Sequence, residues 1–185
     1  MTVSMKKSEY LASRRRCEPE QVRLIVIAES PPDTGLYFYN PTGRPTEPLF
    51  SALMKQLGVS CLSKEQGLRE FQRSGWVLVD ATYEPVNGIR RDSQRNTIIE
   101  RDYPALRDDL IRLTSDRSVP LILLKVNVCR ILEPKLAQDR FTVLNRGIEP
   151  PFPSHGQQNG FHERFGAILD RAAIRSHPSP PRPLT

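Results

Sequence analysis

The sequence predicts an α/β fold of three layers, in which helices cover both faces of a central, mostly parallel four-stranded sheet. Three nearly continuous apolar runs, at 23–28 (RLIVIA), 76–82 (WVLVDAT) and 119–127 (VPLILLKVN), are typical of parallel strands buried on both faces. A weaker run at 141–145 (FTVLN) supplies the expected fourth strand. The intervening segments have apolar residues at helical spacing, and we expect helices at 47–57, 64–74, 96–114, 129–138 and 158–174.

Length and composition predict a single domain. A chain of 185 residues with 38% hydrophobic content is long enough to bury one substantial core. We expect a basic segment at 1–20, the α/β domain at 21–174 and a tail at 175–185 that has too many prolines for a helix. No apolar run approaches the roughly 20 residues of a membrane span, and the first 20 residues lack the apolar centre of a signal peptide. These features favour a cytoplasmic protein without membrane contact, and a monomer is expected.

The cysteines and the net charge indicate which sites and partners to expect. Cys17, Cys61 and Cys129 are widely spaced, odd in number and not in CxxC pairs, so the sequence indicates no disulfide framework and no zinc or iron-sulfur site. We expect no metal or other cofactor. The net charge of +6 suits a polyanionic partner such as DNA, because Lys and Arg displace counterions from phosphates.

The candidate site follows from the strand order. In an open parallel sheet, ligands bind at the carboxyl ends of the strands. That rule selects the loops after Ala28 and Asp80 and the loop at 145–158. The first of these loops, AESPPDTGLYFYN (28–40), combines carboxylates, a rigid turn and aromatic rings. Such a loop can stack a flat nucleobase and hydrogen-bond its edge.

This loop resembles the first motif of the uracil-DNA glycosylase superfamily, GQDPYH followed by GLxFS, or GEAPG in one branch. Glu29 stands where the family has Gln or Glu, and Ser30 stands where it has Asp, Ala or Asn. Phe38 falls on the uracil-stacking Phe, and Tyr39 and Asn40 follow it as further substrate-binding candidates.

Two more matches follow in the family's order, so the resemblance covers about 24–169. GWVLVDATYEPV (75–86) is similar to GVLLLNxxLTV, and Asp80 takes the place of the Asn that binds the pyrimidine edge. An ionised carboxylate only accepts hydrogen bonds, so either burial protonates Asp80 or specificity is altered. FPSH (152–155) resembles the start of HPSPLS, with Phe152 in place of the catalytic His, Ser154 as a substrate contact and His155 three residues on.

The resemblance implies a monofunctional DNA glycosylase of base excision repair, which flips out uracil or a related deaminated base and hydrolyses its N-glycosidic bond. Glu29 orients or activates water or stabilises the sugar cation, Asp80 contacts the base, and His155 stabilises the leaving base. Candidate DNA contacts are Arg90, Arg91 and Arg95, with the alternative that one of them replaces the family's His at the leaving base. Gln157 and Gln158 are further candidates, in a loop that we expect to occupy the duplex gap.

Other interpretations remain open. The chain can be a non-catalytic protein of the same fold that binds damaged or single-stranded DNA, or an enzyme acting on nucleosides. Individual residues also have simpler roles: Glu29 and Ser30 as a helix cap, Asp80 as the cap of a turn, Tyr37 and Tyr39 as packing residues, and His155, the Arg90 cluster and the segment 6–16 as solvated surface.

Overall fold

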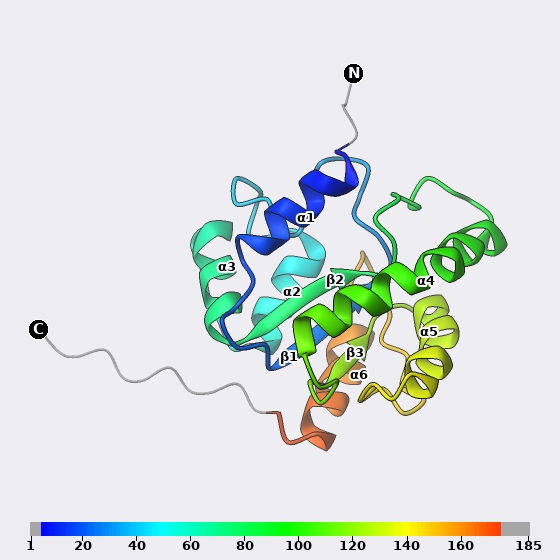
Figure 1. Ribbon diagram of the computed structural model, residues 1–185. Coiled ribbons are helices and arrows are strands. Elements are labelled where there is room, and N and C mark those ends of the chain that lie inside the picture. Colours follow the sequence, from blue (N-terminus) through cyan, green and yellow to red (C-terminus); the bar gives the residue numbers. More distant parts are fainter. Residues whose placement is uncertain (1–4, 175–185) are drawn as a thin grey trace, which may run out of the picture.

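The computed structural model describes residues 5–174, and these residues form an α/β fold with a small open sheet (Figure 1). The elements are α1 (Lys7–Arg15), β1 (Leu24–Ala28), α2 (Pro48–Gln56), α3 (Lys64–Arg73), β2 (Trp76–Asp80), α4 (Asp92–Thr114), β3 (Leu121–Leu123), α5 (Val126–Gln138) and α6 (Gln158–Arg171). The Pro-rich stretch at 175–185 lies outside the described residues.

The sheet has three strands in the order β2-β1-β3, all parallel. In the central strand, Val26 stands opposite Leu78 on one side and Ile122 on the other. Every residue of the three strands is buried, as their continuous apolar runs predict. Because the strands are parallel, the carboxyl ends of all three lie at one edge of the sheet.

The prediction of a fourth strand at 141–145 was wrong. This stretch makes only one isolated parallel bridge, between Val143 and Leu121. The next ladder positions are taken by a side chain: the Asn145 amide accepts from the Leu123 N–H at 2.7 Å and donates to the Leu123 carbonyl at 3.0 Å. Because the side chain replaces the backbone in the ladder, pairing ends after one residue.

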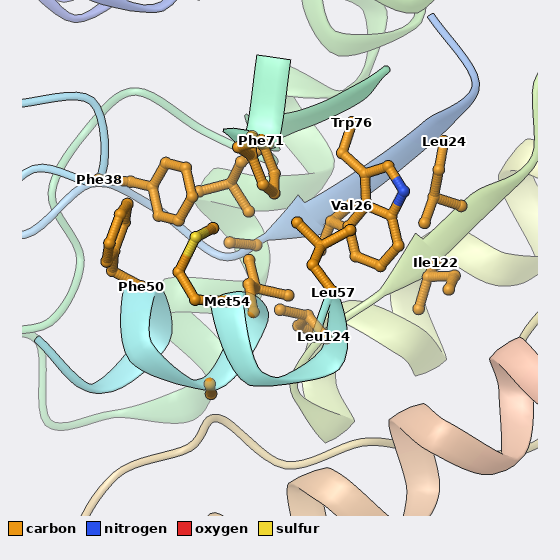
Figure 2. Close-up of a cluster of buried hydrophobic side chains, with 14 of the residues drawn as sticks. Leu24, Val26, Phe38, Phe50, Met54, Leu57, Phe71, Trp76, Ile122 and Leu124 are labelled. Atoms are coloured by element: carbon orange, nitrogen blue, oxygen red, sulfur yellow. The ribbon is translucent and has the colours of Figure 1, made fainter. Parts of the chain in front are cut away.

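Successive residues along each strand point to opposite faces of the sheet, and each face packs against its own layer of helices. Leu24, Val26 and Leu78 belong to a core that includes side chains of α2, α3 and α6, whereas Ile25 and Val79 belong to a second core with α4 and α5. Figure 2 shows the first core, in which aromatic side chains from the loop after β1, from α2 and α3, and from β2 pack together. Helices therefore cover both faces of the sheet.

The third apolar run forms less strand than expected. Instead of 119–127, the strand covers Leu121–Leu123, and one further backbone bond joins the Leu124 N–H to the Ile27 carbonyl at 2.9 Å. The chain then turns at Lys125, whose φ is +78°, and α5 begins at Val126 rather than at Cys129. This early turn places Lys125 at the carboxyl edge of the sheet.

The basic N-terminal segment forms a helix that packs onto the domain. Tyr10 joins the first core, and Arg14 is fully buried. The Arg14 guanidinium binds Asp109 of α4 through two bonds of 2.6 and 2.7 Å and donates to the Tyr83 hydroxyl at 2.6 Å. Arg14 thus fastens α1 to α4. In residues 5–174 no helix is long and apolar enough to cross a membrane.

Candidate functional site

A pocket of about 340 Å³ opens at the carboxyl edge of the sheet. Ala28 and Glu29 after β1, Asp80 at the end of β2 and Lys125 after β3 contribute to its lining. The remaining lining residues come from the loop after β1, the start of α2 and scattered positions: Ser30, Pro31, Pro32, Thr34, Leu36, Tyr37, Phe38, Glu47, Pro48, Leu49, Phe50, Leu78, Asn87 and Phe152. The pocket is therefore largely apolar, with a few charged groups.

Glu29 is held by two side chains from the segment that follows β3, the neighbour of β1 in the sheet. Lys125 Nζ makes an ion pair with Glu29 Oε2, and Asn127 Nδ2 donates to Glu29 Oε1 at 2.7 Å. Asn127 is itself within 3.3 Å of Asn96 Oδ1 on α4. Both carboxylate oxygens are thus fixed. No helix begins at Glu29 or Ser30, since the next one starts at Pro48, so neither residue caps a helix.

Asp80 is a buried carboxyl with an unused oxygen. Its Oδ2 has no hydrogen-bond partner among the described residues. Burial raises the pKa of Asp80 to about 7, and the Arg14 charge opposes that rise only in part. The turn after β2 is capped by Thr82, whose Oγ1 accepts from the Glu84 N–H at 3.0 Å. Asp80 at neutral pH can therefore carry or lack a proton.

Three tyrosines surround Asp80. Burial raises the pKa values of Tyr10, Tyr37 and Tyr83, and the Asp80 charge contributes to each rise. The Tyr37 hydroxyl is buried and has no partner within the described chain. These phenols stay protonated at neutral pH, so none of the three tyrosines adds a charge beside Asp80.

The aromatic half of the first loop is fixed by a buried lysine. Lys64 Nζ donates to the Tyr37 carbonyl at 2.8 Å and pairs with Glu47 at 2.5 Å. Phe38 lines the pocket and packs against Phe50 and Phe71 at centroid distances of 5.4 and 5.0 Å, as Figure 2 shows. The neighbouring rings thus hold Phe38, and 6% of its surface is exposed.

Other candidates in this loop have structural partners. Ser30 Oγ lines the pocket but accepts from the Val86 N–H at 3.2 Å, which ties the first loop to the second. The Tyr39 hydroxyl binds the Leu78 carbonyl and N–H at the free edge of β2, and Asn40 Oδ1 accepts from Thr42. Tyr39 and Asn40 are not among the pocket-lining residues, and Tyr39 is a packing residue here.

The loop before α6 places its polar candidates in solvent. Ser154, His155, Gln157 and Gln158 are all exposed and do not line the pocket. Phe152, the residue at the family's His position, does line it, with 38% of its surface exposed. The pocket is therefore lined here by the apolar ring of Phe152, and not by His155, which the resemblance led us to expect as the catalytic group.

The three arginines lie at the start of α4. Arg90 and Arg91 are exposed, and Arg91 is the residue that precedes the helix. Arg95 is half-buried and forms an ion pair with Asp92 one turn away. None of the three lines the pocket. Arg90 and Arg91 are therefore exposed cations outside the pocket lining.

Sequence reasoning missed Lys125 and Asn127, which lie in contact with Glu29. The one available signal was a lysine that interrupts an apolar run, VPLILLKVN, close to its carboxyl end. The strand ends before this lysine, so its side chain reaches the pocket edge instead of continuing the sheet. Among the described residues, Lys125 is the only cation that lines the pocket.

Within the described part of the chain, no group of three or more His, Cys, Asp or Glu side chains is arranged to hold a metal ion. Comparison with models of known protein families gives no match. Comparison with curated proteins also gives none. The geometry of the pocket is accordingly the basis for a functional conclusion.

Proposed function

We propose that this chain is a DNA glycosylase that removes uracil or a related deaminated base by hydrolysis of the N-glycosidic bond. The observation that carries the proposal is the convergence of Glu29, Lys125, Asp80 and Phe38 on one pocket at the carboxyl edge of the sheet. Two of these four, Glu29 and Phe38, belong to the loop that resembles the first motif of the glycosylase superfamily.

The pocket suits a flat heterocycle with its sugar. Its volume of about 340 Å³ lies in the lower part of the roughly 300–1,000 Å³ found for small-molecule sites. Pro31, Leu36, Phe38 and Phe50 give it apolar walls, against which an extruded base can stack. The few polar groups are then available to orient the base and the sugar.

The paired charges match the charges that develop during cleavage. When the glycosidic bond breaks, the sugar gains positive charge and the departing base gains negative charge. Glu29 offers a carboxylate to the sugar side, and Lys125 offers an ammonium to the base side. The lysine thereby takes over the function that the resemblance assigns to the His whose place Phe152 occupies.

Asp80 is the candidate for contact with the base edge. Because its pKa is near 7, the carboxyl can accept a hydrogen bond from a ring N–H when ionised and donate one to a carbonyl when protonated. The exposed Arg90 and Arg91 provide phosphate contacts beside the pocket, in keeping with the net charge of +6.

The test uses a duplex and a single-stranded oligonucleotide, each with one uracil, followed by alkali to cut abasic sites. We expect strand scission with the wild-type chain and a fall of about 10²–10⁴-fold in rate for Glu29→Gln, the range typical of a general acid or base. The matched control is Glu163→Gln, an exposed residue of α6, which should cleave like the wild type.

One observation favours a second function, that of a non-catalytic protein that binds damaged DNA. Both oxygens of Glu29 already have partners in Lys125 and Asn127, which is also what a purely structural carboxylate needs. Tight binding without scission, on oligonucleotides with uracil, hypoxanthine or xanthine, would support this alternative and contradict the enzyme. Cleavage of free deoxyuridine would instead indicate a nucleoside hydrolase.

A further inference from the structure

The backbone fixes Lys125 at the pocket in an unusual conformation. Its φ of +78° is one that non-glycine residues rarely adopt. The Lys125 N–H donates to the Pro150 carbonyl at 2.8 Å, and the Lys125 carbonyl accepts from the Cys129 N–H at 3.0 Å as α5 begins. The backbone of Lys125 is therefore held on both sides, which fixes the point from which its side chain extends.

The amine is accessible and has a proton acceptor in contact. The Lys125 side chain retains 29% of its surface, compared with 10% for that of Glu29, and both residues line the pocket. Asn127 holds the second Glu29 oxygen at 2.7 Å and thereby fixes the orientation of the carboxylate. Lysine, carboxylate and orienting amide form a connected set in which a proton can pass from Nζ to Glu29.

We propose that Lys125 is also a nucleophile for an aldehyde, and that the chain cuts DNA at abasic sites through an imine formed on this lysine. The inference rests on the proposed function, since removal of a base leaves a deoxyribose whose open-chain form carries an aldehyde at C1′. Lysine amines form imines with such carbonyl groups.

The chemistry balances without another reagent. The Lys125 ammonium gives one proton to Glu29, and the free amine adds to C1′ to form a carbinolamine. Glu29 returns the proton to the new hydroxyl, which leaves as water, so that an ammonium and an aldehyde become a protonated imine and water. Glu29 then takes a proton from C2′, the C3′–O bond breaks, and the departing phosphate takes up the proton from Glu29. Water hydrolyses the remaining imine and restores the lysine.

The experiment uses an oligonucleotide that already contains an abasic site, together with sodium borohydride. Borohydride reduces the imine to a stable amine, so wild-type protein should give a covalent protein–DNA complex on a denaturing gel. Without borohydride, the strand should be cut in the absence of alkali. Peptide mapping of the reduced complex should place the DNA on Lys125.

Lys125→Arg is the decisive variant because it keeps the positive charge beside Glu29 but removes the nucleophilic amine. We expect its trapped fraction to fall to that of a reaction without protein. Lys55→Arg, at an exposed position of α2, should trap as well as the wild type. Circular dichroism shows whether each variant is folded, and the mapped peptide of the wild-type complex tests the assignment without any variant.

Three outcomes would each overturn the inference: a trapped complex that persists in Lys125→Arg, a complex in which the DNA maps to another lysine, or no trapped complex with the wild-type protein. Because the abasic site is supplied, the proposed function is tested separately. Trapping without uracil excision would support the lyase activity of Lys125 and refute the glycosylase activity. Excision without trapping would support the glycosylase activity and refute the lyase activity.

Discussion

Replacement of Asp80 by Asn should make the chain more stable, and increasingly so as the pH rises. Folding raises the pKa of this carboxyl from 3.8 to about 7, mainly by burial. Between those two pH values the unfolded chain loses the proton and the folded chain keeps it, so the wild-type free energy of unfolding falls with increasing pH. Above about pH 7 the loss is complete and levels off.

The magnitude follows from the shift of about three pH units, at about 1.4 kcal/mol for each unit. Full ionisation of Asp80 therefore costs about 4 kcal/mol of stability, of which about 3 kcal/mol falls between about pH 5 and pH 8. Asn has nearly the same shape and does not ionise. The difference in unfolding free energy between variant and wild type should thus grow by about 3 kcal/mol across this range.

Urea unfolding at a series of pH values measures the difference, with fluorescence of Trp76 as the probe because it is the single tryptophan and is buried. All other titrating groups are common to both proteins and cancel. Asp170→Asn, at an exposed position on α6, serves as the control and should run parallel to the wild type. Parallel curves for Asp80→Asn would refute the conclusion that Asp80 is an uncompensated buried carboxyl.

Two further substitutions test the core and the pocket wall. Arg14→Met should lower the free energy of unfolding by about 1.5–3 kcal/mol in the same urea assay, because it removes the two short bonds to the largely buried Asp109, which keeps only Arg112 as an ion-pair partner; a loss no larger than that of the exposed Arg15→Met would contradict the role of this pair. Phe38→Leu should lower uracil excision about 10- to 100-fold through lost stacking. Phe71→Leu, which changes a ring packed behind Phe38 and outside the pocket lining, should lower stability and leave excision intact; equal excision losses would contradict the stacking role.

Much of the fold could be predicted because strands buried on both faces have continuous apolar runs. The runs that contain Leu24–Ala28 and Trp76–Asp80 were recognisable for this reason. The run at 119–127 was not resolved into strand and helix, because Val126 and Val128 extend its apolar character beyond the turn at Lys125. A turn made by a non-glycine residue with a positive φ, such as Lys125, has no signature in the sequence.

The candidate site was predicted only in part, since contacts between distant segments decide it. Glu29 and Phe38 follow β1, and Asp80 ends β2. They lie together because the carboxyl ends of parallel strands meet at one edge of the sheet, as the α/β pattern predicts. The partner of Glu29 comes from 96 residues along the chain and could not be inferred from spacing. His155 was chosen from its position in a motif, and the structure places it in solvent outside the pocket lining.

The burial of two basic residues could not be predicted from the sequence either. Arg14 and Lys64 belong to stretches whose composition is typical of solvated helix faces, yet both side chains are fully buried. Each is neutralised by a carboxylate from another element, Asp109 for the arginine and Glu47 for the lysine. Such pairs compensate the cost of burial only once the elements have come together.

The most direct test of the pocket as a base-excising site is the amount of free base released from DNA. Chromatography with mass detection measures uracil in the supernatant after incubation with an oligonucleotide that carries one uracil. We predict about one uracil for each oligonucleotide with the wild-type chain and Glu163→Gln, and release slowed by about 10²–10⁴-fold with Glu29→Gln. An absence of free uracil with the wild type, or equal release by Glu29→Gln, would contradict the account.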